Sequence, residues 1–174
     1  MSYDVVLKQA DIFYDVSQQQ ISQIAEICDE RIFDMGEIII EENAPGDELF
    51  IIAHGEVEIL IDPALVSDRP DTPSQPITIT TLRRGQSFGE IALVDQGIRS
   101  AGARSASPET RLLVIPRKKL TALCDNDPAL GYQLMRNLAT DLAMKIRNTD
   151  LLMREKLLYE RDSRGDASHQ VRDD

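Results

Sequence analysis

The stretch Gly85-Gln-Ser-Phe-Gly-Glu-Ile-Ala-Leu-Val-Asp-Gln-Gly-Ile-Arg-Ser-Ala-Gly-Ala-Arg-Ser105 combines several features that favour anion binding. Phe88-Gly89 is expected to end a strand, and Gly89 lets main-chain N–H groups come close to an anion because it has no side chain. Residues 90–94 can form one helical turn, whose first N–H groups also favour negative charge. Arg99 offers a planar fork of donors that suits a phosphate. The stretch therefore predicts a phosphate-binding segment at the end of a strand.

Two further polar residues complete this segment. Glu90 has no positively charged neighbour in sequence, so we expect its carboxylate to accept hydrogen bonds from sugar hydroxyls. Ser100 can add a hydroxyl donor beside Arg99. Arg104 has no such context, and an ordinary surface charge is the simpler interpretation of it.

On both sides of this segment, apolar residues recur with a period of two, which indicates strands. The runs that show it are 37–41, 48–54, 56–61, 77–82 and 110–115, with glycines 36, 46, 55, 85 and 97 at the turns between them. Several short strands with regular turn spacing favour a sandwich or a barrel. Residues 62–76 contain four prolines among Ser, Asp and Thr, which predicts a long, mobile loop that we interpret as a tolerated insertion.

Helical periodicity precedes and follows the strands. Residues 3–30 predict two helices, and Ser17 with Gln20 forms a capping-box pattern for the second. After a short helix at 117–125, Asp127 is a good N-cap and Pro128 suits the first position of a last helix. That helix would run to about residue 161 and measure roughly 50 Å. Its far half carries apolar residues that need a partner, namely Leu151, Leu152, Met153, Leu157, Leu158 and Tyr159.

Composition narrows the classes of function. The 174 residues carry a net charge of −11, which disfavours unspecific binding to nucleic acid or to an anionic membrane. The first residues form neither a signal segment nor a membrane span, so we expect a cytoplasmic protein. Cys28 and Cys124 are expected to be buried free thiols, and His54 and His169 are too isolated to predict a metal ligand or a base.

The segment Phe88-Gly-Glu-Ile-Ala-Leu93 followed by Arg99-Ser-Ala101 resembles the phosphate-binding cassette of the cyclic-nucleotide-binding domain family, of the catabolite activator and protein kinase A regulatory subunit type. The strings Gly36-Glu-Ile-Ile-Ile, Gly46-Asp-Glu-Leu-Phe-Ile-Ile and Gly55-Glu-Val match its first strands in the right order. Ile98 departs from the proline that eukaryotic members carry before the arginine. The resemblance implies a stand-alone, bacterial-type member of the family.

The resemblance also implies the roles of individual residues. Glu90 would hold the ribose 2′-hydroxyl and Arg99 the cyclic phosphate. The last helix would cover the base and bring Asn148 and Thr149 near it, although both could equally be solvated helix positions. The complete set of expected ligand-binding residues is Phe88, Gly89, Glu90, Ile91, Ala92, Arg99, Ser100, Ala101, Asn148 and Thr149.

These observations predict an α+β fold, an antiparallel jelly-roll, cupin-like β-barrel with N-terminal helices and a long C-terminal helix. The expected segments are helices at 1–30, the barrel at 31–116 with the cassette at 85–105, two helices at 117–162 and a disordered tail at 163–174. The expected function is that of a receptor for a cyclic nucleotide, cyclic AMP before cyclic GMP, that uses no metal and signals through its C-terminal helix.

The same observations predict the partners. We expect a homodimer through the C-terminal helix, an unidentified protein partner, and no binding to nucleic acid or membrane. Two alternatives stay open: a catabolite-activator-type transcription regulator that is truncated or deficient in DNA binding, and a ligand-free dimerisation module. The sequence shows no nucleophile beside a base, no metal-ligand spacing and no catalytic pair of acids, so we do not expect an enzyme.

Overall fold

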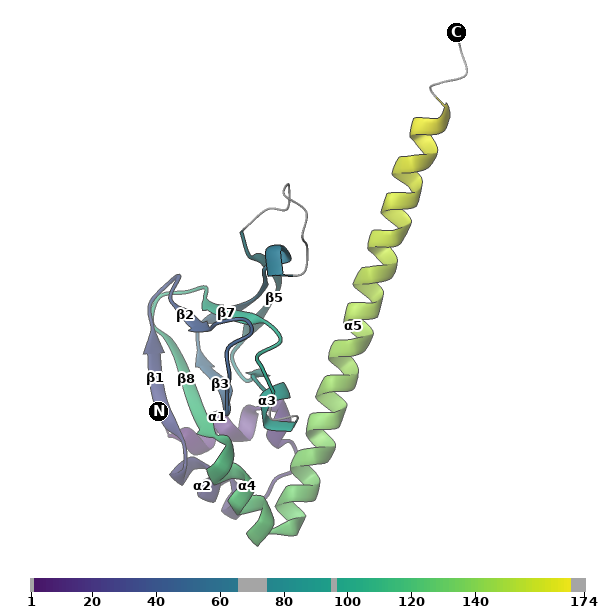
Figure 1. Ribbon diagram of the computed structural model, residues 1–174. Helices are drawn as coiled ribbons and strands as arrows, with labels where there is room; N and C mark the ends of the chain where they lie inside the picture. Colours follow the sequence, from purple (N-terminus) through teal and green to yellow (C-terminus); the bar gives the residue numbers. More distant parts are fainter. Residues whose placement is uncertain (1, 66–74, 95–96, 170–174) are drawn as a thin grey trace. The chain divides into compact units, whose positions relative to one another are not determined.

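A computed structural model describes residues 2–65, 75–94 and 97–169 (Figure 1). The chain divides into two compact units, Met1–Asn137 and Leu138–Asp174. The first unit holds the β-barrel and the helices at its end. The described residues of the second unit lie in the last helix.

The barrel consists of two four-stranded sheets in which every pairing is antiparallel. The first sheet has the order β1 (Asp29–Phe33), β8 (Thr110–Pro116), β3 (Glu48–His54) and β6 (Ser87–Phe88). The second has the order β2 (Ile38–Ile40), β7 (Gly102–Ser105), β4 (Glu56–Ile61) and β5 (Ile77–Arg83). This arrangement confirms the predicted antiparallel jelly-roll.

The core lies between the two sheets. Along β3 and β8, alternate residues belong to this core, and the residues between them, such as Ile51 and Leu113, are buried as well. The rings of Phe50 on β3 and Phe88 on β6 stack with centroids 5.0 Å apart. The buried cluster comprises Ile40, Phe50, Ile52, Val57, Leu82, Phe88, Ala103, Leu112 and Val114.

The N-terminal helices gather at one end of the barrel, where α4 also lies (Figure 1). They are α1 (Tyr3–Gln9), the short 3₁₀ helix η1 (Asp11–Phe13) and α2 (Gln18–Glu26). The predicted capping box is confirmed: the Ser17 hydroxyl accepts from the Gln20 N–H, and the Gln20 side chain accepts from the Ser17 N–H. These helices bury their apolar faces, including Leu7, Ile12 and Ile21.

The junction between α4 (Arg117–Asn126) and α5 (Pro128–His169) is tied to α2. Asp127 Oδ1 accepts from the N–H groups of Ala129 and Leu130 at 3.1 Å, as predicted for an N-cap. Its other oxygen accepts from Gln20 Nε2 at 2.7 Å. One carboxylate therefore both starts α5 and joins it to the N-terminal helices.

Some predicted boundaries differ from the structure. The strands begin at Asp29 rather than near residue 31, and β7 lies within the predicted cassette. The last helix was expected to end near 161, with disorder from 163, but α5 continues to His169. A single glycine such as Gly165 costs a helix only about 1 kcal/mol, which does not stop it. Of the predicted mobile loop at 62–76, Pro63–Leu65 forms a 3₁₀ helix, and residues 66–74 lie outside the described residues.

Both cysteines are free thiols, as predicted. Cys28 is buried and its Sγ donates to the Ile24 carbonyl at 3.1 Å. Burial, with a smaller effect of the nearby Asp29 carboxylate, raises the pKa of Cys28 to about 12. Cys124 is half-buried rather than buried, and burial raises its pKa as well.

The second unit exposes large apolar side chains along α5. Asp141 and Lys145 form an ion pair one turn apart, at 2.8 Å. The exposed apolar side chains described in this unit include Met144, Ile146, Leu151, Leu152, Met153 and Leu158.

Candidate ligand-binding site

The predicted phosphate-binding segment starts where β6 pairs with β3. Gly89 follows β6 with φ +80°, a conformation that residues with a side chain rarely adopt. Ile91–Val94 then forms the single helical turn α3. Gly89 therefore permits the sharp change of direction between the strand and this turn.

Arg99 is buried, with 6 % of its surface exposed. Its Nη1 donates to the main-chain carbonyls of Glu48 at 3.0 Å and Gly89 at 3.1 Å, and its Nη2 donates to Glu48 O at 3.0 Å. The guanidinium also lies 5.6 Å from the centre of the Phe50 ring, within the range of a cation–π contact. The side chain is thus held by main-chain oxygens at the ends of two strands.

Electrostatics around Arg99 act in two directions. Burial lowers its pKa, because desolvation disfavours the charged form. The carboxylates of Glu48, Asp47 and Glu90 act the other way and raise it. Since the pKa of a guanidinium ordinarily lies far above neutral pH, the Arg99 side chain stays a cation.

The segment between β2 and β3 fixes the backbone of Arg99. Asn43 N–H donates to Arg99 O and Arg99 N–H donates to Ala44 O, both at 2.9 Å. Pro45 forms an isolated antiparallel bridge with Ile98. This pairing places residues 98 and 99 antiparallel beside residues 43–45.

A cavity of about 200 Å³ lies beside these groups. It combines one buried guanidinium with several carboxylates and an apolar floor. Its described lining is Ile39, Ile40, Glu41, Ala44, Pro45, Gly46, Asp47, Glu48, Phe50 and Arg99. An anionic group with attached hydroxyl donors would find both kinds of partner there.

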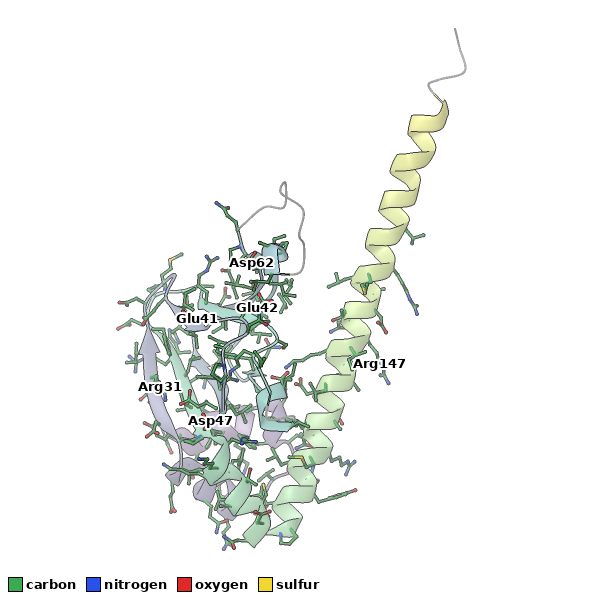
Figure 2. All side chains as sticks on the ribbon, in the orientation of Figure 1. Arg31, Glu41, Glu42, Asp47, Asp62 and Arg147 are labelled. Atoms are coloured by element: carbon green, nitrogen blue, oxygen red, sulfur yellow. The ribbon has the colours of Figure 1, made fainter. Side chains whose placement is uncertain are left out.

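The acidic residues of this lining are not equivalent. The Glu48 carboxylate is bound by the Arg31 guanidinium, through Nη2–Oε1 at 2.5 Å and Nη1–Oε2 at 3.2 Å. Figure 2 shows Glu41 near β2 and Asp47 toward the α4 end of the same segment. Arg31 therefore offsets the charge of Glu48, while the main-chain carbonyl of Glu48 faces Arg99.

The other predicted residues occupy different surroundings. Phe88 belongs to the core rather than to the described lining of the cavity. Glu90 is buried, with 5 % exposed, and lies close enough to influence the pKa of Arg99. Ile91 and Ala101 are half-buried, Ser100 is exposed, and the backbone of Ala92 belongs to α3. Among the described lining residues, Arg99 is the one that the sequence singled out.

Asn148 and Thr149 lie on α5 in the second unit, and both are exposed. The Thr149 hydroxyl donates to the Lys145 carbonyl at 2.9 Å, which satisfies it within the helix. Their approach to a base stays a prediction.

Sequence reasoning missed the contribution of the segment between β2 and β3. Gly46, Asp47 and Glu48 line the cavity, but the sequence assigned them only to a turn and the start of a strand. A glycine followed by two acidic residues, between two predicted strands, was the available signal. This pattern did not indicate a binding site, because the group of Glu48 that holds Arg99 is its main-chain carbonyl and not its side chain.

Comparison with known proteins decides the family. The model of the cyclic nucleotide-binding domain matches residues 30–127, more than half of the chain. The chain belongs to the cyclic nucleotide-binding domain family. The matched range contains the whole predicted cassette and every described strand except Asp29, the first residue of β1. It is a regulatory domain, of a class that is typically non-catalytic.

Curated relatives include members from bacteria and animals. The chain is 28 % identical over 145 residues to the cyclic AMP receptor protein of Thermus thermophilus, which covers 83 % of this chain and 61 % of that protein. It is 29 % identical over 117 residues to a cGMP-dependent protein kinase of Caenorhabditis elegans, covering 67 % of this chain and 14 % of the kinase. The chain thus spans only part of these relatives.

Solved structures share the fold. The catabolite activator protein of Thermus thermophilus has a TM-score of 0.67 at 26 % identity, covering 83 % of this chain and 62 % of that one. A cyclic nucleotide-binding domain from Methylobacillus flagellatus has a TM-score of 0.71 at 24 % identity, covering 84 % and 79 %. The latter similarity bears on the fold alone.

Two further features of the described residues concern metal binding and membranes. Within the described residues, no group of three or more His, Cys, Asp or Glu side chains is arranged to hold a metal ion. No helix in the described part of the chain is both long and apolar enough to cross a membrane.

Proposed function

We propose that this protein is a receptor for a cyclic nucleotide, with cyclic AMP preferred and cyclic GMP possible. The observation that carries this proposal is the buried Arg99, whose guanidinium is held by carbonyls beside a cavity. A buried guanidinium that main-chain carbonyls hold in a regulatory domain is suited to a phosphate ligand. The relatives include a cyclic AMP receptor protein and cGMP-dependent kinases, so both ligands enter the test.

In this proposal Arg99 binds the cyclic phosphate and Glu90 accepts from the ribose 2′-hydroxyl. The buried Glu90 near Arg99 supports this division, because one ligand can meet both groups. Gly89, Ile91 and Ala92 would supply main-chain N–H groups, and Ser100 a hydroxyl. Asn148 and Thr149 would reach the base from α5. Phe88 would support the site by packing on Phe50.

Isothermal titration calorimetry with cyclic AMP, cyclic GMP and a cyclic dinucleotide tests the proposal. We expect saturable binding of at least one cyclic mononucleotide, with cyclic AMP the tighter. The corresponding linear 5′-monophosphate is the matched control, since it carries the same base, sugar and phosphorus without the ring. No heat with either cyclic mononucleotide would leave the ligand-free dimerisation module as the better description.

We further propose that the signal leaves through α5 as a change in a homodimer. The exposed apolar side chains of the second unit support this, because water disfavours such a surface. The free thiols are compatible with action in the cytoplasm. A downstream protein partner would read the change in the helix.

A transcription regulator of the catabolite activator type is the second candidate. The similarity to the Thermus proteins favours it, and they extend beyond the matched region. This candidate requires a DNA-binding domain in the same gene product. The length of the genomic reading frame compared with the intact mass of this chain separates the two.

A further inference from the structure

Gly46 lacks the usual reason for a glycine at a turn. Its φ is not positive, so its backbone conformation is open to residues with a side chain. What a side chain would meet there is Arg99. A Cβ at position 46 would lie 1.9 Å from Arg99 Nε and 2.3 Å from Cζ, well inside van der Waals contact. The requirement at this position is therefore space for the guanidinium.

The close approach follows from the pairing next to it. The hydrogen bonds between Asn43, Ala44 and Arg99, with the Pro45–Ile98 bridge, fix the register of the two segments. That register brings the next residue, Gly46, over the arginine side chain. Arg99 cannot be moved simply by shifting one backbone, because its own N–H and C=O are both used in the pairing.

Gly89 and Phe50 also lie close to the guanidinium. A Cβ on Gly89 would lie 2.6 Å from Arg99 Nη1, and the Phe50 ring lies 5.6 Å away. The three hydrogen bonds to Glu48 O and Gly89 O fix the remaining direction. An arginine displaced by a methyl group at position 46 would have to give up these bonds.

We propose that Gly46 is a positioning residue, which sets the place of the Arg99 guanidinium by leaving room for it between the two strand ends. Nucleotide affinity then depends on the absence of a side chain at position 46. This inference rests on the proposed function. It adds a residue that affects ligand binding through Arg99 rather than by touching the ligand with a side chain of its own.

A double-mutant cycle tests it with Gly46→Ala, Arg99→Ala and the double variant. Cyclic AMP binding is measured by calorimetry, and thermal unfolding is measured without nucleotide. We expect Gly46→Ala to lose about tenfold or more in affinity, because a charge-assisted set of bonds is displaced. In the Arg99→Ala background, Gly46→Ala should cause no further loss.

The unfolding measurement needs no ligand. Gly46→Ala should lower the midpoint by about 3–6 °C in the Arg99 background, and by no more than about 1 °C when the arginine side chain is absent. Gly102→Ala is the control for stability, since its Cβ would meet its nearest neighbour at an ordinary 3.5 Å. Its midpoint should stay close to that of the parent.

Parent-like affinity in Gly46→Ala would overturn the proposal, as would an equal loss of midpoint in both backgrounds. If Gly46→Ala does not fold, a folded double variant supports the proposal. A double variant that fails while Arg99→Ala folds contradicts it. If the parent binds no cyclic nucleotide, the proposed function fails, and the unfolding cycle still decides whether Gly46 positions Arg99.

Discussion

The barrel and the second half of α5 treat apolar side chains in opposite ways. In the barrel, residues such as Phe50, Ile52 and Leu112 are fully buried among one another. In the second unit, Ile146 is 62 % exposed and Met153 is 60 % exposed. The barrel buries an apolar core within one chain, although Ile38 and Ile77 on its strands are exposed, whereas these side chains of the helix are mostly exposed. Ligand recognition and assembly should therefore be separable by mutation.

The largest effect should come from the barrel. Arg99→Ala removes the guanidinium and leaves a site lined by carboxylates, so we expect a loss of about 30- to 1000-fold in cyclic AMP affinity, measured by calorimetry. Arg104→Ala is the matched control, because that arginine is paired with Glu58 at 2.7 Å on β4. Equal losses from both variants would show that general charge, rather than the Arg99 site, governs binding.

The second effect should come from the helix. Ile146→Asp with Met153→Asp places charges on exposed apolar positions, and each should weaken self-association by about tenfold or more. Sedimentation velocity would report a shift toward monomer, while cyclic AMP affinity stays near that of the parent.

Arg147→Ala controls for this, since it changes an exposed charged residue of the same helix turn (Figure 2). A parent that sediments as a monomer with and without nucleotide would remove the dimer from the proposal. Loss of nucleotide affinity in the double variant would show that the two regions do not act separately.

A smaller effect concerns the sugar. If Glu90 accepts from the 2′-hydroxyl, 2′-deoxy cyclic AMP should bind the parent about tenfold or more weakly than cyclic AMP. Glu90→Gln keeps the shape of the side chain and removes its charge, so it should reduce that ratio. A parent that binds both nucleotides equally would exclude Glu90 as the group that recognises ribose.

The smallest effect concerns the junction that joins the barrel to α5. The hydrogen bond from Gln20 and those from the Leu130 and Ala129 N–H groups lower the pKa of Asp127. A depressed pKa means that the carboxylate favours the folded state above its ordinary pKa, and that this contribution is lost as the pH falls through the folded value.

Asp127→Asn retains a capping side chain that does not titrate. Thermal unfolding of the two proteins should therefore differ more at about pH 7 than at about pH 2, with the parent more stable at the higher pH. A difference that is constant across this range would show that the charge of Asp127 does not contribute.

Much of the fold could be predicted because its signals are local. The capping box at Ser17 and the Asp127–Pro128 helix start each depend on residues a few positions apart. Strands β3, β4 and β8 carry strong apolar patterns. Charged residues around Gly165 suit either a helix or a disordered segment, and the structure continues α5 to His169.

The candidate site was predictable only in part. Arg99 and Glu90 stand in a motif, and both are buried. The surroundings of Arg99 could not be predicted. They consist of the main-chain carbonyls of Glu48 and Gly89, and they depend on the absence of a side chain at Gly46. Main-chain groups are present at every residue, so the sequence does not mark those that the fold brings together.

The buried Cys28 has a consequence for the redox chemistry of the protein. With its pKa raised to about 12, the Cys28 thiol stays protonated near pH 7, and the thiolate is the form that attacks peroxides, disulfides and alkylating agents. Cys124, half-buried and with its pKa also raised, is the more accessible of the two. A slow, single modification at Cys124 is therefore the expected response to maleimide. Cys28, between α2 and β1, should withstand oxidants without covalent change.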